Sequence, residues 1–152
     1  MKLDKELTLI NVEAVSKEEV LELLGNKLLD KGFVKEGFVK SVLQREASYP
    51  TGLPTQPYGV AIPHTDGDMV NESKIAFASL KNPVRFTAMG QGDVEVEVKL
   101  VFMLALKKPA DQLETLQKLV GLFQDAETVS QLASVKDAQE LNELVAGKGS
   151  KA

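Results

Sequence analysis

The stretch Gly59-Val60-Ala61-Ile62-Pro63-His64-Thr65-Asp66-Gly67-Asp68 contains the one histidine of this 152-residue chain. Its apolar run, residues 60–62, predicts a short strand inside a sheet. Pro63 ends the strand because proline has no N–H to continue a ladder, and it favours an extended residue before it. The polar residues that follow are loop formers. The sequence therefore predicts that His64 stands on a stiff backbone at the rim of an α/β domain, where such domains usually carry their chemistry.

Two helices and a stiff loop are predicted upstream of this stretch. Residues 7–12 alternate and predict a strand. Ser16 and Glu19 form a capping box, which predicts a helix that starts at Ser16 and ends at Gly32. A second helix is predicted over residues 35–47, with Arg45 in its last turn. Residues 49–58 contain three prolines and predict an irregular but stiff loop.

Downstream, the pattern predicts strands first and helices last. Residues 94–106 predict one long strand, which alternates at first and is apolar on both faces from residue 101, so we expect helices to cover both sides of its end. Asp111 is predicted to cap a helix, with Glu114 completing a capping box. The other predicted elements are a strand at 75–80, a turn at Asn82-Pro83, a short strand at 84–87 and helices at 126–132 and 137–145.

The composition predicts one α/β domain with a mixed β-sheet flanked by helices. With 43% hydrophobic and 26% charged residues, the chain is typical of a soluble globular protein. We assign residues 1–147 to this domain and residues 148–152 to a disordered tail. A formal net charge of −4 gives no reason to expect nucleic acid as a partner. No apolar run is long enough for membrane insertion, so we expect a cytoplasmic protein.

Most kinds of chemistry lack the residues that they need. A catalytic zinc site needs three protein ligands, whereas this chain has one histidine and no cysteine, so we expect no metal. Neither a phosphate-binding glycine loop nor a dinucleotide fingerprint is present, so we expect no cofactor. The remaining candidate for chemistry is His64 itself, acting as a general acid/base or as a nucleophile. If its electrophile is a phosphoryl group, the site also needs a cation, and Arg45 is the candidate.

Three groups of residues together resemble a known family. Arg45-Glu46, Pro50-Thr51-Gly52 and the stretch from Gly59 to His64 are similar to the signature of the enzyme IIA components of the bacterial sugar phosphotransferase system, fructose/mannitol class. The likeness extends from residue 7 to residue 145. It implies that His64 accepts a phosphoryl group from the phosphocarrier protein HPr and passes it to a cysteine of enzyme IIB, which feeds the membrane permease, enzyme IIC.

The family often has a second histidine near the site, and here that position is Gln112. This departure, like the run from Tyr49 to Gly52, resembles the galactitol branch. We therefore expect Gln112 to donate a hydrogen bond to the phosphoryl group. The alternatives are a phosphorylation-dependent regulatory module of the nitrogen-branch type and an interaction domain with a structural histidine. In plainer interpretations, Arg45 only complements its helix dipole and Gln112 is a solvated residue of a first helical turn.

Overall fold

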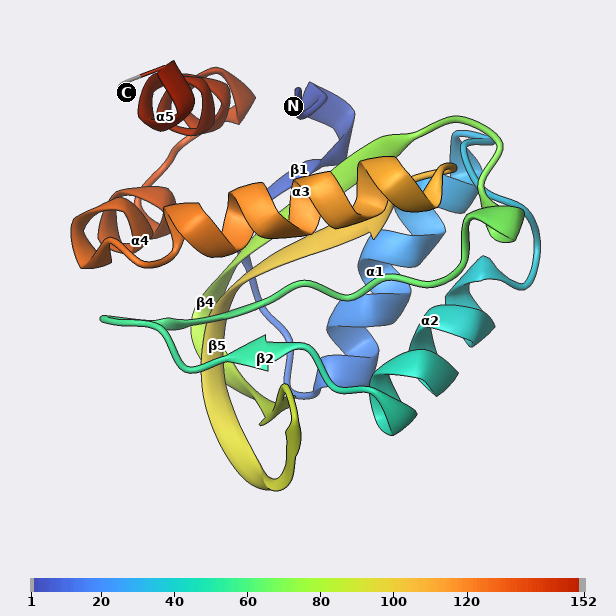
Figure 1. The fold of residues 1–152 in the computed structure, drawn as a ribbon, viewed down its shortest axis with the longest axis horizontal. Coiled ribbons are helices and arrows are strands. Elements are labelled where there is room, and N and C mark those ends of the chain that lie inside the picture. The colour runs from blue at the N-terminus through green and yellow to red at the C-terminus, as the bar shows by residue number, and fades with distance from the viewer. Residues whose placement is uncertain (1, 151–152) are drawn as a thin grey trace.

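A mixed five-stranded sheet forms the centre of the fold (Figure 1). The structure is a computed structural model that describes residues 2–150. The two long strands β4 and β5 pair antiparallel as a hairpin, β1 runs parallel to β4, and β3 runs parallel to β5. The short strand β2 is antiparallel to β3 and meets the end of β4. The bounds are β1 Thr8–Val12, β2 Gly52–Leu53, β3 Gly59–Ala61, β4 Lys74–Ala88 and β5 Gln91–Ala105.

Helices cover both faces of this sheet, which confirms the predicted α/β fold (Figure 1). Helices α1 (Lys17–Asp30) and α2 (Phe38–Ser48) pack on one face, and α3 (Pro109–Leu122), α4 (Ala126–Ala133) and α5 (Ala138–Ser150) pack on the other. Two short 3-10 helices, η1 (Lys5–Leu7) and η2 (Gly67–Met69), complete the chain. The predicted N-cap is confirmed, since the Ser16 hydroxyl accepts a hydrogen bond from the Glu19 N–H.

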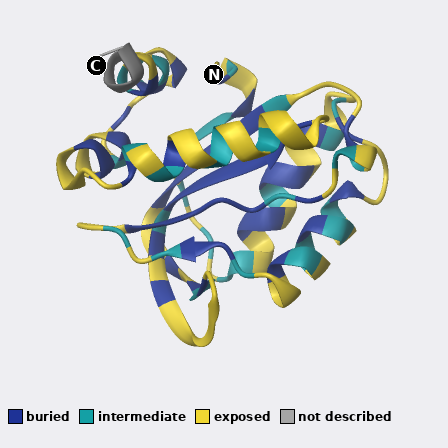
Figure 2. Ribbon diagram, viewed as in Figure 1, coloured by how far each residue is buried: buried dark blue, intermediate teal, exposed yellow. Residues whose placement is uncertain are grey.

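Strand β5 separates two hydrophobic cores. Val101, Met103 and Ala105 belong to the core under α1 and α2, whereas Phe102 and Leu104 belong to the core under α3, α4 and α5. Both faces of the last part of the strand are therefore buried, as the sequence predicts, while its first residues and the hairpin tip are exposed (Figure 2).

Two predictions of irregular structure are wrong. Asn82-Pro83 is not a turn, because β4 is one strand through it. The pairing with β5 shifts register between Ser79 and Val84, and Pro83 is exposed at this irregularity, where no ladder bond is needed from its missing N–H. The proline loop also contains β2, so it is not irregular throughout.

Helix ends account for the remaining differences. Helix α2 begins at Phe38, not near residue 35, because Gly37 precedes it with a left-handed backbone (φ 95°). Helix α3 begins at Pro109 and its N-cap is Lys108, so Asp111 is not the cap. Proline fits the first helical position because the N–H that it lacks would have no partner there. Helix α5 extends to Ser150, so residues 148–150 of the predicted tail are helical; residues 151–152 lie outside the described residues, and the domain boundary at 147 stays a prediction.

Candidate active site

His64 continues the line of β3 beside the end of β5. It forms an isolated parallel bridge with Leu104, and the Leu104 N–H donates to the Pro63 carbonyl at 3.0 Å. The residues on either side of His64, Pro63 and Thr65, are buried, while His64 is half-buried. The imidazole is therefore presented at the sheet rim from a backbone that β5 holds in place.

One contact determines which nitrogen of His64 can react. The Nδ1 atom lies 2.9 Å from the Ile62 carbonyl oxygen. A carbonyl only accepts hydrogen bonds, so Nδ1 carries the proton and donates it, which leaves the lone pair of the neutral ring on Nε2. Burial lowers the pKa of His64 below its ordinary value of 6.5, and the nearby charge of Arg45 lowers it further, against the opposing effects of the Ile62 bond and Asp66. His64 is thus a neutral base at neutral pH.

Arg45 lies close enough to His64 for its charge to act on the imidazole. It comes from the last turn of α2, and its Nη1 atom is 3.6 Å from Oδ1 of Asp66, two residues after His64. Its guanidinium also lies over the ring of Tyr49, 5.4 Å from the centroid. Because Asp66 and Arg45 are both partly solvated, this ion pair contributes little to stability. The pair does hold the guanidinium at the histidine loop.

Two of the predicted site residues contain an unsatisfied polar atom. Among the described residues, the buried side-chain polar atoms without a hydrogen-bond partner are Nε of Arg45 and Oε1 of Gln112. Buried polar atoms normally have partners, so each of these two atoms calls for an explanation. Their occurrence in two residues singled out from the sequence supports a site for a polar ligand.

Gln112 occupies a different helical position from the one predicted. It is the fourth residue of α3, and its own N–H already donates to the Lys108 carbonyl at 3.0 Å. The start of α3 is nevertheless close to the histidine loop, since a Cβ atom added at Gly67 would overlap the Lys107 carbonyl oxygen. Arg45 reaches the histidine loop through its ion pair with Asp66. Gln112 is related to that loop through the close approach of Gly67 to the connection between β5 and α3.

A buried carboxylate behind the site was not among the predicted site residues. Glu46 is 3% exposed, and its two oxygens accept hydrogen bonds from the N–H and the hydroxyl of Thr51, both at 2.8 Å. Burial raises the pKa of Glu46, and the two bonds from Thr51 oppose that rise. A signal for it exists in the sequence: Phe38, Val42 and Glu46 follow each other at intervals of four, so the charge falls on the buried face of α2.

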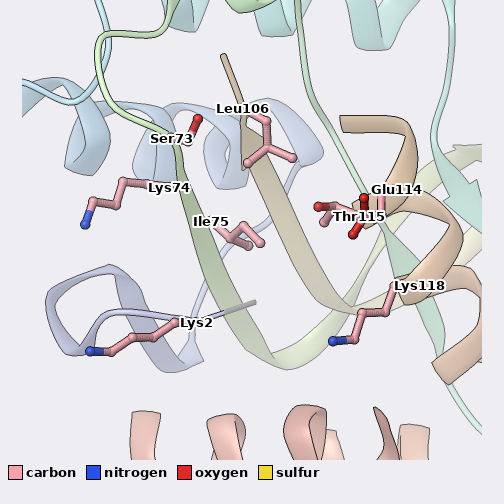
Figure 3. Close-up of a pocket in the computed structure, with 8 residues that line it drawn as sticks. All are labelled: Lys2, Ser73, Lys74, Ile75, Leu106, Glu114, Thr115 and Lys118. Carbon is pink, nitrogen blue, oxygen red and sulfur yellow. The ribbon is translucent and has the colours of Figure 1, made fainter. Parts of the chain in front are cut away.

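Other features of the described residues lie away from this chemistry. A pocket between α3 and the sheet contains none of the three predicted site residues, and its Lys74 is already paired with Asp4 at 2.8 Å (Figure 3). The pocket is lined by Lys2, Ser73, Lys74, Ile75, Leu106, Glu114, Thr115 and Lys118.

No group of three possible metal ligands occurs in residues 2–150. Within the same range, no helix is both long enough and apolar enough to span a bilayer.

Comparison with known proteins agrees with the fold and identifies the family. The family described as "Phosphoenolpyruvate-dependent sugar phosphotransferase system, EIIA 2" matches residues 1–148. The chain is 32% identical over 128 residues to the galactitol-specific EIIA component of Escherichia coli K12, covering 84% of this chain and 85% of that protein. It is 31% identical over 142 residues to the mannitol-specific enzyme IIA component of Halalkalibacterium halodurans, covering 91% and 90%.

A solved structure extends the likeness to three dimensions. The NMR structure of the complex of enzyme IIA(Mtl) and phosphorylated enzyme IIB(Mtl) from Escherichia coli matches with a TM-score of 0.79 and 26% identity, over 96% of this chain and 98% of that chain. The protein belongs to the EIIA 2 family of the phosphoenolpyruvate-dependent sugar phosphotransferase system. It is a phosphotransferase component of the fructose/mannitol class, with resemblance to the galactitol branch.

Proposed function

We propose that this protein carries a phosphoryl group on Nε2 of His64, which it receives from phospho-HPr and passes to a cysteine of enzyme IIB. The observation that carries this proposal is the bond from Nδ1 of His64 to the Ile62 carbonyl, because it leaves Nε2 as the free nucleophile. The membership of the EIIA 2 family supports the same role.

The transfer forms one bond and breaks one bond. The Nε2 lone pair attacks the phosphorus atom of phospho-HPr and forms the new bond. The bond between phosphorus and HPr breaks, and the atom of HPr that held the phosphoryl group keeps the electron pair of that bond. The Nδ1 proton stays in its bond to the Ile62 carbonyl, where it stabilises the positive charge that develops on the ring. Arg45 moves from Asp66 toward the phosphoryl oxygens, and its unsatisfied Nε–H gives it a donor for them.

Gln112 supplies a neutral hydrogen bond to the phosphoryl group. Its buried Oε1 atom has no hydrogen-bond partner. Half a turn of the carboxamide places the NH₂ group at that buried position instead. A carboxamide donates at any pH, so it does the work of a second histidine without adding a titration. This role of Gln112 rests on its position and on its unsatisfied oxygen.

The similar proteins support a proposal for the partners and the substrate class. HPr, an enzyme IIB of the galactitol type and, through it, the permease IIC are the partners, and the relay takes place in the cytoplasm. The transported compound in this proposal is a sugar alcohol like galactitol, a choice supported by the 32% identity over 128 residues to the galactitol-specific EIIA component of E. coli K12.

A reconstituted relay tests the proposed function. Phosphoenolpyruvate, enzyme I and HPr are mixed with this protein and with enzyme IIB of either the galactitol or the mannitol type. We expect phosphoryl transfer through His64 to the galactitol IIB at a higher rate than to the mannitol IIB, and none through the His64→Ala variant. Phosphorylation of the protein without passage to either IIB would contradict the carrier role.

A further inference from the structure

A continuous chain of hydrogen bonds joins Glu46 to the imidazole of His64. The Glu46 carboxylate accepts from the Thr51 hydroxyl at 2.8 Å, and the Thr51 oxygen accepts from the Ile62 N–H at 3.2 Å. The carbonyl of the same Ile62 accepts from Nδ1 of His64 at 2.9 Å. The chain connects α2, the proline loop and the end of β3, three segments that come together only in the fold.

The chemistry of the groups sets the direction of each bond. A hydroxyl has one proton and two lone pairs, whereas an ionised carboxylate only accepts. Glu46 therefore accepts a hydrogen bond from the Thr51 hydroxyl. A lone pair of the Thr51 oxygen then remains to accept a hydrogen bond from the Ile62 N–H. The second Glu46 oxygen accepts from the Thr51 N–H at 2.8 Å, so the backbone of Thr51 is held as well as its side chain.

Ile62 needs this support because it lies just beyond the paired part of its strand. Strand β3 ends at Ala61, and Ile62 is 1% exposed, so its N–H has no water to bond to. The peptide between Pro63 and His64 is already fixed, since the Pro63 carbonyl accepts from the Leu104 N–H. The backbone rotation of Ile62 is thus the remaining freedom that could move its carbonyl away from His64, and Thr51 restrains it.

We propose that Glu46 and Thr51 are positioning residues that hold His64 in the tautomer with the proton on Nδ1, and so keep the lone pair on Nε2. Neither residue touches the phosphoryl group in this account. They act through Ile62, whose carbonyl is in place only while its N–H is bonded. The consequence for phosphoryl transfer rests on the proposed function, but the consequence for the tautomer does not.

The test measures the tautomer of His64 by ¹⁵N NMR, in a protein whose single imidazole gives one pair of ring signals. Thr51→Val removes the hydroxyl at nearly constant size, and Glu46→Gln places an NH₂ donor against one of the two Thr51 donors. We expect both variants to gain population with the proton on Nε2. We also expect phospho-HPr to phosphorylate them at least about tenfold more slowly than the parent.

Two matched variants separate positioning from general loss of stability. Thr51→Ser keeps the hydroxyl and should restore both the tautomer and the rate. Thr128→Val removes another hydroxyl that is 1% exposed and donates to a carboxylate at 2.8 Å, but on α4 beyond the far end of α3, so it should leave both readouts at parental values.

The proposal is overturned if Thr51→Val and Glu46→Gln keep the parental tautomer population, whatever their rates. It is also overturned if the tautomer shifts and the rate of phosphorylation stays parental. Should Thr51→Val fail to fold, Glu46→Gln decides between the outcomes. If the parent itself accepts no phosphoryl group, the proposed function fails, while the tautomer measurement still tests the positioning of His64.

Discussion

At His64, a nucleophile must be neutral and yet held in one orientation. Burial provides the first condition by disfavouring the charged imidazolium, and the Ile62 carbonyl provides the second by engaging Nδ1. The bond to Ile62 alone would raise the pKa, so burial and the charge of Arg45 must outweigh it. The lowered pKa that results keeps Nε2 free to react at neutral pH.

The first prediction at this scale concerns pH. Because the pKa of His64 lies below 6.5, the single-turnover rate of phosphorylation by phospho-HPr should still exceed half of its high-pH value at pH 6.5 and fall to half only at a lower pH. The imidazole of His64 binds a proton more tightly in the unfolded chain than in the folded protein. The contribution of neutral His64 to the free energy of unfolding is therefore complete above pH 6.5 and is lost as the pH falls through the folded-state pKa. A rate that halves at or above pH 6.5 with a pH-independent donor would contradict it.

Arg45 and Gln112 should differ in how much they contribute. Arg45→Ala removes a charged donor that meets developing charge, so we expect a loss of about 3 kcal/mol in transfer, roughly a hundredfold in rate. Gln112→Ala removes a neutral donor and should cost about 1 kcal/mol, a several-fold loss. Single-turnover rates with phospho-HPr measure both, and denaturant midpoints close to the parent's serve as the control. Equal rates for Gln112→Ala and the parent would place Gln112 outside the site.

The sequence predicts His64 and Arg45 as neighbours, whereas it does not reveal what supports them. His64 stands out because it is unique, and Arg45 because a phosphoryl group needs a cation. Glu46 was assigned no role in the site, since a charged residue in a helix is usually solvated and its burial depends on contacts with Thr51, five residues later. That dependence on tertiary contact is what a linear pattern conceals.

At the scale of elements, β3 aligns the site by packing closely against β5. A Cβ atom on Gly59 would lie 2.5 Å from the Val96 side chain and 2.6 Å from the Glu97 carbonyl oxygen. No side chain fits there without moving β3. The position of His64 therefore depends on a glycine five residues earlier.

Gly59→Ala should separate these strands and lower the free energy of unfolding by about 1–3 kcal/mol. Gly121→Ala is the matched control, because no atom lies within 4 Å of the added Cβ and the site is in helix α3. Alanine favours a helix, so this variant should be more stable by about 0.5–1 kcal/mol. Urea unfolding measures both. A Gly59→Ala protein as stable as the parent would show that β3 can shift without cost.

Hydrophobic periodicity predicts the elements well, but their ends depend on single residues. The change from alternating to continuous apolar residues correctly predicts that β5 becomes covered on both faces. The sequence pattern places the start of α3 too late because Asp111 and Glu114 mimic a capping box inside the helix, while Pro109 is the residue that begins it. The sequence does not predict the strand through Pro83, because the proline is tolerated only by a local shift in the register of the pairing with β5.

At the scale of the whole molecule, the two ends of the chain are joined. The side chain of Asn142 in α5 accepts from the Leu3 N–H and donates to the Leu3 carbonyl, both at 2.8 Å. Figure 1 shows the N-terminal segment beside α5. These contacts close the core under α3, α4 and α5, to which Leu3 also belongs.

Asn142→Ala should lower the free energy of unfolding by about 1–3 kcal/mol, because it leaves the backbone of Leu3 without its partners. Phosphoryl transfer at a temperature where the variant is folded should be unchanged, since α5 supplies no residue of the proposed site. Urea unfolding and the rate with phospho-HPr are the two measurements. A variant with parental stability but slower transfer would mean that the chain ends take part in docking HPr.

The central claim is that the phosphoryl group is carried on Nε2 of His64. The direct measurement is the coupling between ³¹P and the ring nitrogens of ¹⁵N-labelled protein after incubation with phosphoenolpyruvate, enzyme I and HPr. The account predicts a one-bond coupling to Nε2 while Nδ1 keeps its proton, and no phosphorus signal from the His64→Ala variant. A phosphoryl group on Nδ1, or on any residue other than His64, would contradict it.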